Sequence, residues 1–470
     1  MAALGIAPIM MLYMTVDAFV LRDLPKVGDV LESELGRTLL AAAPRWAVVD
    51  AVRAEIESRR SARDARPLDP VMLRAAVDAR LSVSLRRVVN ATGVVLHTNL
   101  GRAPLAEAAV ERVADVARGY SNLELALDDK KRGSRHEHVV ELLRALTGAE
   151  DALVVNNCAA AVLLALTGLA QGGDVVVSRG ELVEIGGGFR VPEVMAASGA
   201  RLVEVGTTNR TRLADYDRVG VRLLMKVHRS NFAIVGFTEE ASVAELAPLA
   251  RRLGVPLFVD LGSGSLATIA GLPGDPEPTV PSLVASGADL VAFSGDKLVG
   301  GPQAGILVGK RALVATLSRH PLLRALRPDK LTIAALEATL ALHRDGRSAE
   351  IPTVAMLSVP EPTLESRARA LSARLSIVRP DGHFTACRVR SAVGGGSMPT
   401  VEPWSWAVRA SVPGASEAAL DEQLRRSRPA VLGRLSGGEL LLDVRTLLSD
   451  DATAIENAFA PARAPERTGG

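Results

Sequence analysis

The sequence predicts an α/β protein whose largest part is a mainly parallel sheet flanked by helices. Between about residues 86 and 330, short β-rich runs alternate with Ala/Leu-rich stretches of helical character. Strands separated by helices form βαβ units, and these build parallel sheets. Polar motifs follow several of the runs, at the carboxyl ends of strands where such sheets bind ligands. The predicted strands lie within DALVVNN (151–157), GGDVVVSRG (172–180), ARLVEVG (200–206), RLLMKV (222–227), VPLFVDL (255–261) and DLVAFSG (289–295).

The two ends of the chain differ from this pattern and predict two further domains. Residues 1–85 are predicted to form a helical N-terminal domain, because apolar residues recur at helical spacing from residue 17 onward. A long helix at 331–345 leads into a smaller α+β domain that spans residues 331–470. That domain is predicted to hold strands at 385–390, 406–412 and 439–445, a helix at 416–426 and a disordered tail at 460–470.

Composition excludes several classes of protein. The 470 residues carry a net charge of only +2, so no global field draws the chain to DNA or to a membrane. Cys158 and Cys387 lie far apart and form neither a metal-binding pattern nor a disulfide framework, which predicts a cytoplasmic protein without a metal site. The apolar run 4–14 is too short to span a bilayer and lacks the marks of a signal peptide. We interpret the first 13 or so residues as a mis-assigned start, with translation beginning at Met14 or Met11.

A lysine follows one predicted strand in the string FSGDKLVGGPQAG, residues 293–305. A lysine that forms a Schiff base must sit on a rigid strand end, be partly desolvated and remain accessible to substrate. The small residues around Lys297 would let a cofactor approach the backbone closely. An ordinary surface lysine in a turn is the alternative interpretation.

Two other strand ends supply what pyridoxal 5'-phosphate needs. Asp260 ends an apolar strand in VDLGSGS (259–265), where a carboxylate can pair with the pyridinium nitrogen. In VNNCAAAVLLAL (155–166), free N–H groups of Asn157, Cys158 and Ala159 at a helix start can bind the phosphate, with the Ser294 hydroxyl as a further ligand. Helix capping by Asn157 and simple space filling by Cys158 are the alternatives, and capping is compatible with phosphate binding.

These elements occur in the order phosphate loop, aspartate, lysine, which is the order of the aspartate-aminotransferase-like superfamily (fold type I) of pyridoxal-phosphate enzymes. Over residues 17–460 the chain also resembles bacterial selenocysteine synthase, L-seryl-tRNA(Sec) selenium transferase. The resemblance rests on VNATGVVLHTNLGRAPL (89–105), YSNLELALDDKKRGSRHEHV (120–139), ELVEIGGGFRVPEVM (181–195), VGTTNRT (205–211), the lysine string, PLLRALRPDKLT (321–332) and GGGSMP (394–399).

The resemblance implies a reaction and roles for particular residues. Enzymes of this family convert L-seryl-tRNA(Sec) to L-selenocysteinyl-tRNA(Sec), through an aldimine with the cofactor and β-elimination to aminoacrylate, followed by addition of selenium from selenophosphate. Lys297 matches the Schiff-base lysine, which also moves the α-proton, and Asp296 matches an acidic residue that assists proton transfer. Three arginines match those that hold the donor phosphate: Arg102, Arg324 and Arg327.

Arg445, in LLDVRT (441–446), keeps two interpretations. Arg445 either meets the tRNA end or forms a structural salt bridge, because an aminoacyl ester has no carboxylate to bind. No role follows for His97, His136 or His138.

The resemblance also implies an RNA-binding N-terminal domain and a ring of dimers, expected to be a homodecamer. Five arginines bunch within fourteen residues of that domain and are either phosphate contacts or a solvated helix face: Arg53, Arg59, Arg60, Arg63 and Arg66.

Two alternatives compete with the transferase. One is a related pyridoxal-phosphate lyase that acts on small molecules such as phosphorylated amino-sugar acids, which has no need of an RNA-binding domain. The other is a catalytically silent RNA-binding scaffold, against which the intact lysine, aspartate and phosphate loop argue.

Overall fold

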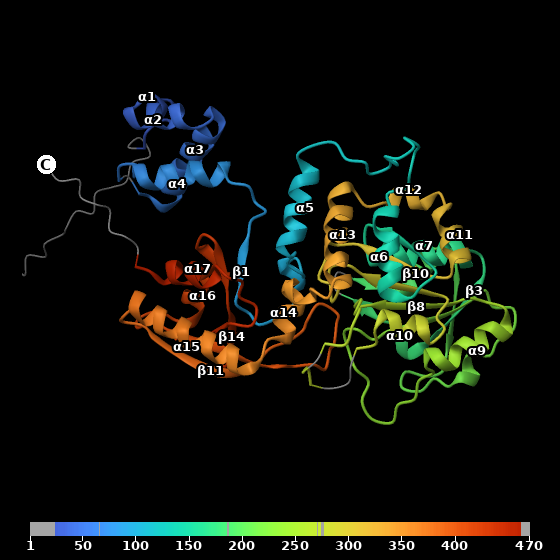
Figure 1. Ribbon diagram of the computed structural model, residues 1–470. Coiled ribbons are helices and arrows are strands. Elements are labelled where there is room, and N and C mark those ends of the chain that lie inside the picture. Colours follow the sequence, from blue (N-terminus) through green and yellow to red (C-terminus); the bar gives the residue numbers. More distant parts are fainter. Residues whose placement is uncertain (1–23, 65, 186–187, 270, 274–276, 462–470) are drawn as a thin grey trace, which may run out of the picture. The chain divides into compact units, whose positions relative to one another are not determined.

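A computed structural model describes residues 24–64, 66–185, 188–269, 271–273 and 277–461 (Figure 1). The apolar run at 4–14, on which the start-site prediction depends, lies outside the described residues, as does most of the predicted disordered tail. The chain divides into two compact units between Arg87 and Val88. Each unit has its own apolar core, so each is described by itself.

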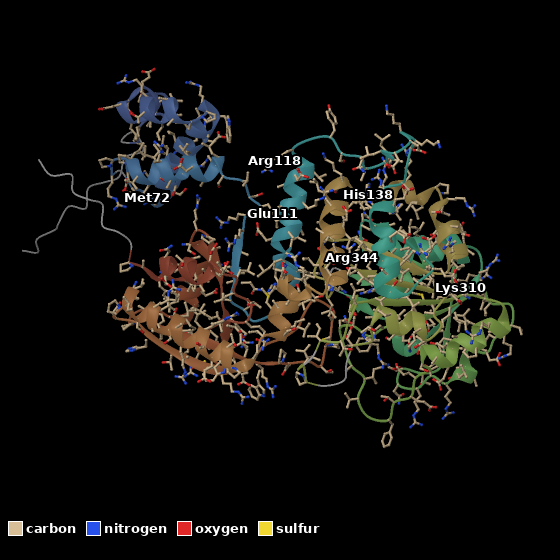
Figure 2. All side chains as sticks on the ribbon, viewed as in Figure 1. Met72, Glu111, Arg118, His138, Lys310 and Arg344 are labelled. Carbon is tan, nitrogen blue, oxygen red and sulfur yellow. The ribbon has the colours of Figure 1, made fainter. Side chains whose placement is uncertain are left out.

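The N-terminal unit is helical, as predicted. Ser33 and Asp69 cap two of its helices by accepting hydrogen bonds from backbone N–H groups of the first turn. Its core gathers apolar residues from all four helices, including the fully buried Val48, Val52 and Val77. The helices are α1 (Val27–Glu32), α2 (Glu34–Ala42), α3 (Arg45–Ala62) and α4 (Pro70–Leu81), and the exposed Met72 lies on α4 (Figure 2).

The second unit holds a seven-stranded sheet in the order β2-β10-β9-β8-β7-β3-β6. The pairings that join β9, β8, β7, β3 and β6 are parallel, whereas β10 runs antiparallel to both β9 and β2. The mainly parallel sheet is therefore confirmed. Its strands are β2 (Asp151–Val155), β3 (Asp174–Ser178), β6 (Arg201–Val205), β7 (Leu223–Val227), β8 (Leu257–Gly262), β9 (Leu290–Ser294) and β10 (Gly305–Gly309).

Helices bury both faces of this sheet, which explains why β8, β9 and β10 consist entirely of buried residues. One apolar core includes residues of α6 (Glu137–Thr147), α9 (Val243–Leu253), α10 (Val280–Ala285) and α13 (Lys330–Arg344). The opposite core includes α7 (Cys158–Ala170), α8 (Val191–Ala197), α11 (Arg311–Ser318) and α12 (Leu322–Leu326). Helix α5 (Glu107–Ala117) packs on α13, and β4 (Glu184–Ile185) pairs with β5 (Phe189–Arg190).

The C-terminal part of this unit is an antiparallel sheet covered by helices. Phe384 and Phe459 meet edge to face in its core, with ring centroids 5.2 Å apart. Its strands follow the order β11 (His383–Arg390), β12 (Trp404–Ser411), β15 (Glu439–Asp443) and β14 (Arg434–Ser436). Its helices are α15 (Glu361–Val378), α16 (Glu417–Arg426) and α17 (Asp451–Phe459), and α14 (Pro352–Ser358) precedes them.

The segment after Arg87 pairs with the C-terminal part of the unit, although the sequence pattern grouped residues 86–330 together. Strand β1 (Val88–Asn90) runs parallel to β13 (Ala430–Leu432), and Val94 forms a bridge with Ala392. Strands β1 and β13 form a two-stranded sheet of their own, and the chain then continues to α5, which packs on α13.

Candidate active site

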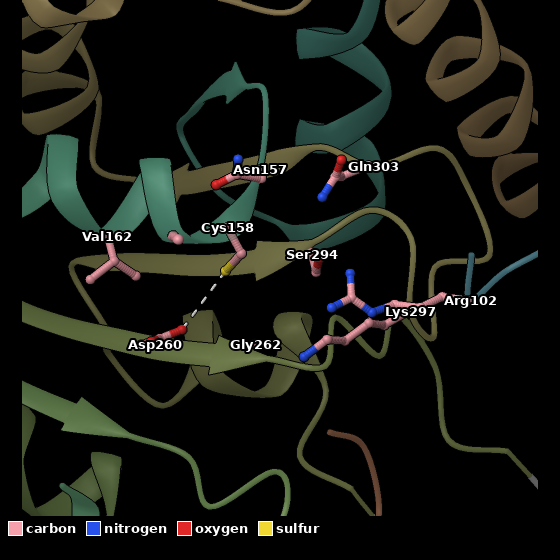
Figure 3. A pocket seen from close by; sticks show the side chains of 10 residues that line it. Arg102, Asn157, Cys158, Val162, Asp260, Gly262, Ser294, Lys297 and Gln303 are labelled. Atoms are coloured by element: carbon pink, nitrogen blue, oxygen red, sulfur yellow. Dashed lines mark hydrogen bonds between the residues drawn. The ribbon is translucent and has the colours of Figure 1, made fainter. Parts of the chain in front are cut away.

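A cavity of about 230 Å³ opens at the carboxyl ends of β2, β8 and β9 (Figure 3). Every residue that the sequence predicted to bind the cofactor lines it. Parallel strands deliver side chains from distant parts of the chain to one edge, which is why this prediction could be made. The lining residues are Arg102, Asn157, Cys158, Ala159, Val162, Asp260, Gly262, Ser294, Lys297 and Gln303.

Lys297 lies three residues beyond the end of β9 and is only 5% exposed. Its Nζ donates a hydrogen bond to the Gly396 carbonyl at 3.3 Å. Burial lowers the pKa of this ammonium, and the positive charge of Arg102 lowers it further, while the anionic groups nearby oppose the shift. A lysine with a depressed pKa supplies the neutral amine that attacks a carbonyl carbon.

Asp260 lies within β8 and is 5% exposed. Burial raises the pKa of its carboxyl to about 6, although the charges of Lys297 and His228 oppose the shift. The Cys158 thiol donates to its Oδ1 at 3.9 Å. A carboxylate that is destabilised by burial in this way gains most from a cationic partner such as a protonated ring nitrogen.

This burial predicts that Asp260→Asn stabilises the cofactor-free protein. The folded-state pKa lies above the unfolded value, so the contribution of Asp260 to stability is complete below about pH 4 and falls as pH rises through about 6. At pH 8 we expect the variant to be more stable by about 2 to 3 kcal/mol. Urea unfolding of both proteins at pH 4 and pH 8 measures the difference, and a gain that is equal at the two pH values would contradict the explanation.

The start of α7 keeps both of its predicted roles open. The Asn157 side chain accepts a hydrogen bond from the Ala160 N–H at 2.9 Å, so it caps the helix. The N–H groups of Cys158 and Ala159 donate to none of the described residues, and both residues line the cavity. Burial raises the pKa of the Cys158 thiol well above its usual value, which favours the space-filling role over a nucleophilic one.

Asp296 joins two of the predicted site residues. The Arg102 guanidinium donates to its Oδ2 at 2.8 Å, and the Ser294 hydroxyl donates to its Oδ1 at 2.6 Å. Ser294 therefore lines the cavity, but its hydroxyl hydrogen is directed to Asp296 and is not free for a phosphate. Arg102 adopts a left-handed backbone conformation with φ of 61° and holds its guanidinium beside Asp296 from there.

The other two predicted donor-binding arginines do not line the cavity. Helix α12 ends at Leu326, and Arg327 follows it with extended backbone, so Arg324 and Arg327 do not share a continuous helical turn. Both residues are exposed, and Arg327 lies 3.9 Å from Glu124. One chain, as far as it is described, therefore places only Arg102 at the cavity.

The arginine cluster of the N-terminal unit is largely paired with carboxylates. Arg59 is the least exposed of the paired arginines, with a side chain that is 11% exposed, and it also donates to the Arg66 carbonyl. Arg63 ends α3 in a left-handed conformation. This pairing favours the solvated helix face for several of the five, since surface ion pairs of this kind form readily within one helix. The ion pairs are Arg53–Asp50, Arg59–Glu55, Arg60–Glu57 and Arg66–Asp64.

The residues without an assigned role make local structural contacts. Arg445 is 3% exposed and donates to the carbonyls of Met356 and Trp404, which favours a structural role. Burial lowers the pKa of His136 to about 4, and its Nδ1 accepts from the Val154 N–H. His138 bonds the Leu123 carbonyl, and the His97 Nδ1 is buried without a partner among the described residues.

Four residues at the site were not singled out from the sequence: Val162, Gly262, Gln303 and Gly396. Gln303 lines the cavity from the loop between Lys297 and β10. Gly396 accepts the hydrogen bond from Lys297. Both lie within strings that carry the family resemblance, which was the available signal.

Comparisons with known proteins agree on the family. The family profile described as L-seryl-tRNA selenium transferase matches residues 88–448. The chain belongs to this family. A profile described as selenocysteine synthase N terminal matches residues 21–60. The L-seryl-tRNA(Sec) selenium transferase of Geobacter sulfurreducens is 50% identical over 93% of this chain and 98% of its own length. That of Carboxydothermus hydrogenoformans is 46% identical over 92% and 95%.

A solved structure supports the fold. The D-glucosaminate-6-phosphate ammonia-lyase structure superposes with a TM-score of 0.56 at 21% identity, covering 81% of this chain and 96% of that one. At this identity the likeness shows the fold alone, and the predicted fold type I is confirmed. No helix among the described residues is both long and apolar enough to cross a bilayer.

Membership of the selenium transferase family makes this chain a pyridoxal-phosphate enzyme, and the cavity fits that cofactor. It offers a buried amine on Lys297 and a buried carboxylate on Asp260. At the start of α7 it also offers backbone N–H groups that have no acceptor among the described residues. These groups would hold the aldehyde, the ring nitrogen and the phosphate respectively. When bound, the cofactor supplies an electron-withdrawing ring that acidifies the α-proton of an attached amino acid.

Proposed function

We propose that this enzyme converts L-seryl-tRNA(Sec) to L-selenocysteinyl-tRNA(Sec) in the cytoplasm, with selenophosphate as the selenium donor. The cavity at Lys297 carries this proposal, because a family member with an intact lysine, aspartate and phosphate-binding helix start retains the parts that the chemistry needs. The curated relatives of similar length that bear this enzyme name support the choice of substrate.

The residues at the cavity divide the work of the reaction. The Lys297 amine accepts the α-proton of the seryl group, and burial, which lowers its pKa, favours the neutral amine that this step requires. The Cβ–O bond then breaks and the hydroxyl leaves as water. Selenium from selenophosphate next forms a Cβ–Se bond at the same carbon, water cleaves the P–Se bond so that phosphate leaves, and a proton returns to Cα. Asp296, oriented by Arg102 and Ser294, is the second group that can carry a proton close to Lys297.

The donor phosphate requires cations that one chain does not gather. Arg102 reaches the cavity, whereas Arg324 and Arg327 lie on an exposed segment next to Glu124. We therefore assign Arg324 and Arg327 to the cavity of a second subunit within a dimer, and the dimers to a ring, expected to be a decamer. Large apolar side chains exposed on loops of the single chain support self-association: Tyr120, Leu127, Val235 and Phe237.

A shared cavity predicts complementation between inactive subunits. Lys297→Ala and the double variant Arg324→Ala/Arg327→Ala should each be inactive alone. Co-expressed at equal levels, they should regain about a quarter of wild-type activity, because half of the dimers are mixed and each mixed dimer has one intact site. Selenocysteinyl-tRNA formation measures the recovery, and light scattering confirms assembly. Activity no higher than that of either variant alone would place the arginines in their own subunit's site.

We assign tRNA binding to the N-terminal unit, where the arginines of α3 lie. Four of the five predicted arginines have carboxylate partners, so the RNA must displace those partners or bind the face through other groups. The match of residues 21–60 to the N-terminal profile of the family supports this assignment.

One experiment tests the function as a whole. Purified enzyme is incubated with seryl-tRNA(Sec) and selenophosphate, and the visible absorbance of the lysine-bound cofactor and the charged tRNA product are both recorded. We expect the absorbance and selenocysteinyl-tRNA(Sec) together. Absorbance with no reaction of the tRNA would refute the substrate and favour a small-molecule lyase, whereas absence of both would refute the cofactor assignment in this chain.

A further inference from the structure

The glycine loop, defined here as Gly394–Met398, reaches the reacting amine from the C-terminal part of the unit. The Gly396 carbonyl accepts the hydrogen bond from Lys297 Nζ at 3.3 Å, across 99 residues of sequence. This is the hydrogen bond that the structure gives to the Lys297 ammonium. A substrate group that lies beside the Lys297 amine during the reaction must therefore also lie close to the glycine loop.

Tight packing fixes the position of this loop. The Leu96 N–H donates to the Val393 carbonyl at 2.8 Å. Gly394 and Gly395 have φ of 78° and 60°, and a Cβ on Gly395 would stand 2.5 Å from the Leu96 carbonyl oxygen. Only glycine fits such a left-handed, crowded position. The loop is therefore held against the segment that leads to Arg102.

The loop offers hydrogen-bond donors that nothing else in the described chain uses. The N–H groups of Gly394, Gly395 and Gly396 donate to none of the described residues. Ser397 is 2% exposed, and its hydroxyl has no partner among them. A buried unpartnered hydroxyl is unfavourable unless a ligand satisfies it. A ligand group that only accepts hydrogen bonds, such as a carbonyl oxygen, matches these donors.

The charges at the cavity are balanced before any substrate arrives. Among the described lining residues the cations are Arg102 and Lys297, and the carboxylate is Asp260, with Asp296 paired to Arg102. Arg445 is buried and directs its guanidinium to two backbone carbonyls. The Gly396 carbonyl also turns its negative end toward Lys297. Within one chain, as far as it is described, the free carboxylate of an amino acid would thus find no unengaged cation, and the two arginines assigned to the cavity from the second subunit, Arg324 and Arg327, are taken up by the donor phosphate.

We propose that the glycine loop binds the carbonyl of an uncharged seryl ester and that the site thereby discriminates against free serine. This inference rests on the proposed function, of which it specifies how the aminoacyl group is recognised. The ester carbonyl accepts hydrogen bonds from the loop N–H groups and the Ser397 hydroxyl. Free serine would place an ionised carboxylate at the same donors without a counter-ion, which is costly in a buried site.

The first test compares three small ligands on the cofactor-loaded enzyme: L-serine methyl ester, L-serinamide and L-serine. Titration by visible absorbance and by calorimetry gives their dissociation constants. We expect the ester and the amide to bind at least about tenfold more tightly than serine. Serine binding as tightly as the ester overturns the proposal. Failure of ester and amide to bind also overturns it, and seryl-tRNA(Sec) turnover measured in parallel shows whether the proposed function fails as well.

The second test uses Ser397→Ala, which removes an unpartnered hydroxyl and should leave the fold intact. We expect affinity for the ester to fall about fivefold and affinity for serine to fall less, because serine is already held poorly at these donors, with the visible spectrum of the resting enzyme unchanged. Ser397→Thr keeps the hydroxyl and should restore ester affinity. Ser198→Ala, a buried serine that bonds the Met195 carbonyl, is the matched control. An equal loss for ester and serine would indicate a merely structural role and overturn the assignment of Ser397.

Discussion

Lys297→Ala is expected to lower turnover of seryl-tRNA(Sec) by at least about a thousandfold, because it removes both the covalent anchor of the cofactor and the base for the α-proton. The side chain is buried and its pKa is lowered by that burial, so its removal takes a poorly solvated cation out of the interior. The variant should therefore stay folded and still bind tRNA. Single-turnover product formation and the loss of the lysine-bound absorbance measure the effect.

Lys310→Ala provides the control for this variant. Lys310, labelled in Figure 2, precedes α11 and pairs with Asp289. Asp289 lies just before β9, whereas Lys297 lies beyond the other end of that strand. Lys310→Ala should leave both turnover and absorbance unchanged. If Lys297→Ala retained turnover, the assignment of Lys297 as the catalytic lysine would be wrong. Loss of tRNA binding in the same variant would contradict the separation of chemistry from RNA recognition.

The strand-end residues could be predicted because their positions follow from local pattern. Apolar runs of five or six residues identify β2, β8 and β9, and a parallel sheet brings the ends of such strands to one edge. Asp260, Cys158 and Lys297 then meet in the cavity without any knowledge of distant contacts. The segment that follows Lys297 leads directly into β10, whose antiparallel direction is not implied by strand–helix alternation.

Contacts between distant segments could not be predicted in this way. The hydrogen bond from Lys297 to Gly396 joins two segments that lie 99 residues apart in the sequence. Nothing in the sequence around either residue predicts that it contacts the other. The pairing of β1 with β13 has the same character. The Ser294 hydroxyl was expected to bind the phosphate of the cofactor. In the structure it donates its hydrogen bond to the carboxylate of Asp296, two residues further along the chain. Which of two possible hydrogen-bond partners a side chain contacts depends on small differences in distance and angle, and residue type alone does not determine these.

Removal of residues 1–87 should weaken binding of seryl-tRNA(Sec) by about a hundredfold or more, because phosphate contacts and their released counterions supply most of the affinity for a nucleic acid. The remaining chain keeps the large sheet, the small sheet and the cavity, whose cores contain no residue of the N-terminal unit. Its lysine-bound absorbance and its thermal unfolding should therefore match those of the full chain.

A variant that removes only charges distinguishes the electrostatic contribution to tRNA affinity from the effect of deleting the whole N-terminal unit. In Arg53→Gln/Arg60→Gln/Arg63→Gln three exposed arginines, two on α3 and one at its C-cap, lose their charge, while the largely covered Arg59 keeps its pairing with Glu55. If these arginines bind phosphates, the dependence of tRNA affinity on salt should become less steep by about one unit for each arginine–phosphate pair removed. An unchanged slope would show that α3 presents only a solvated face, and the RNA-binding surface of the unit would then have to lie on other helices.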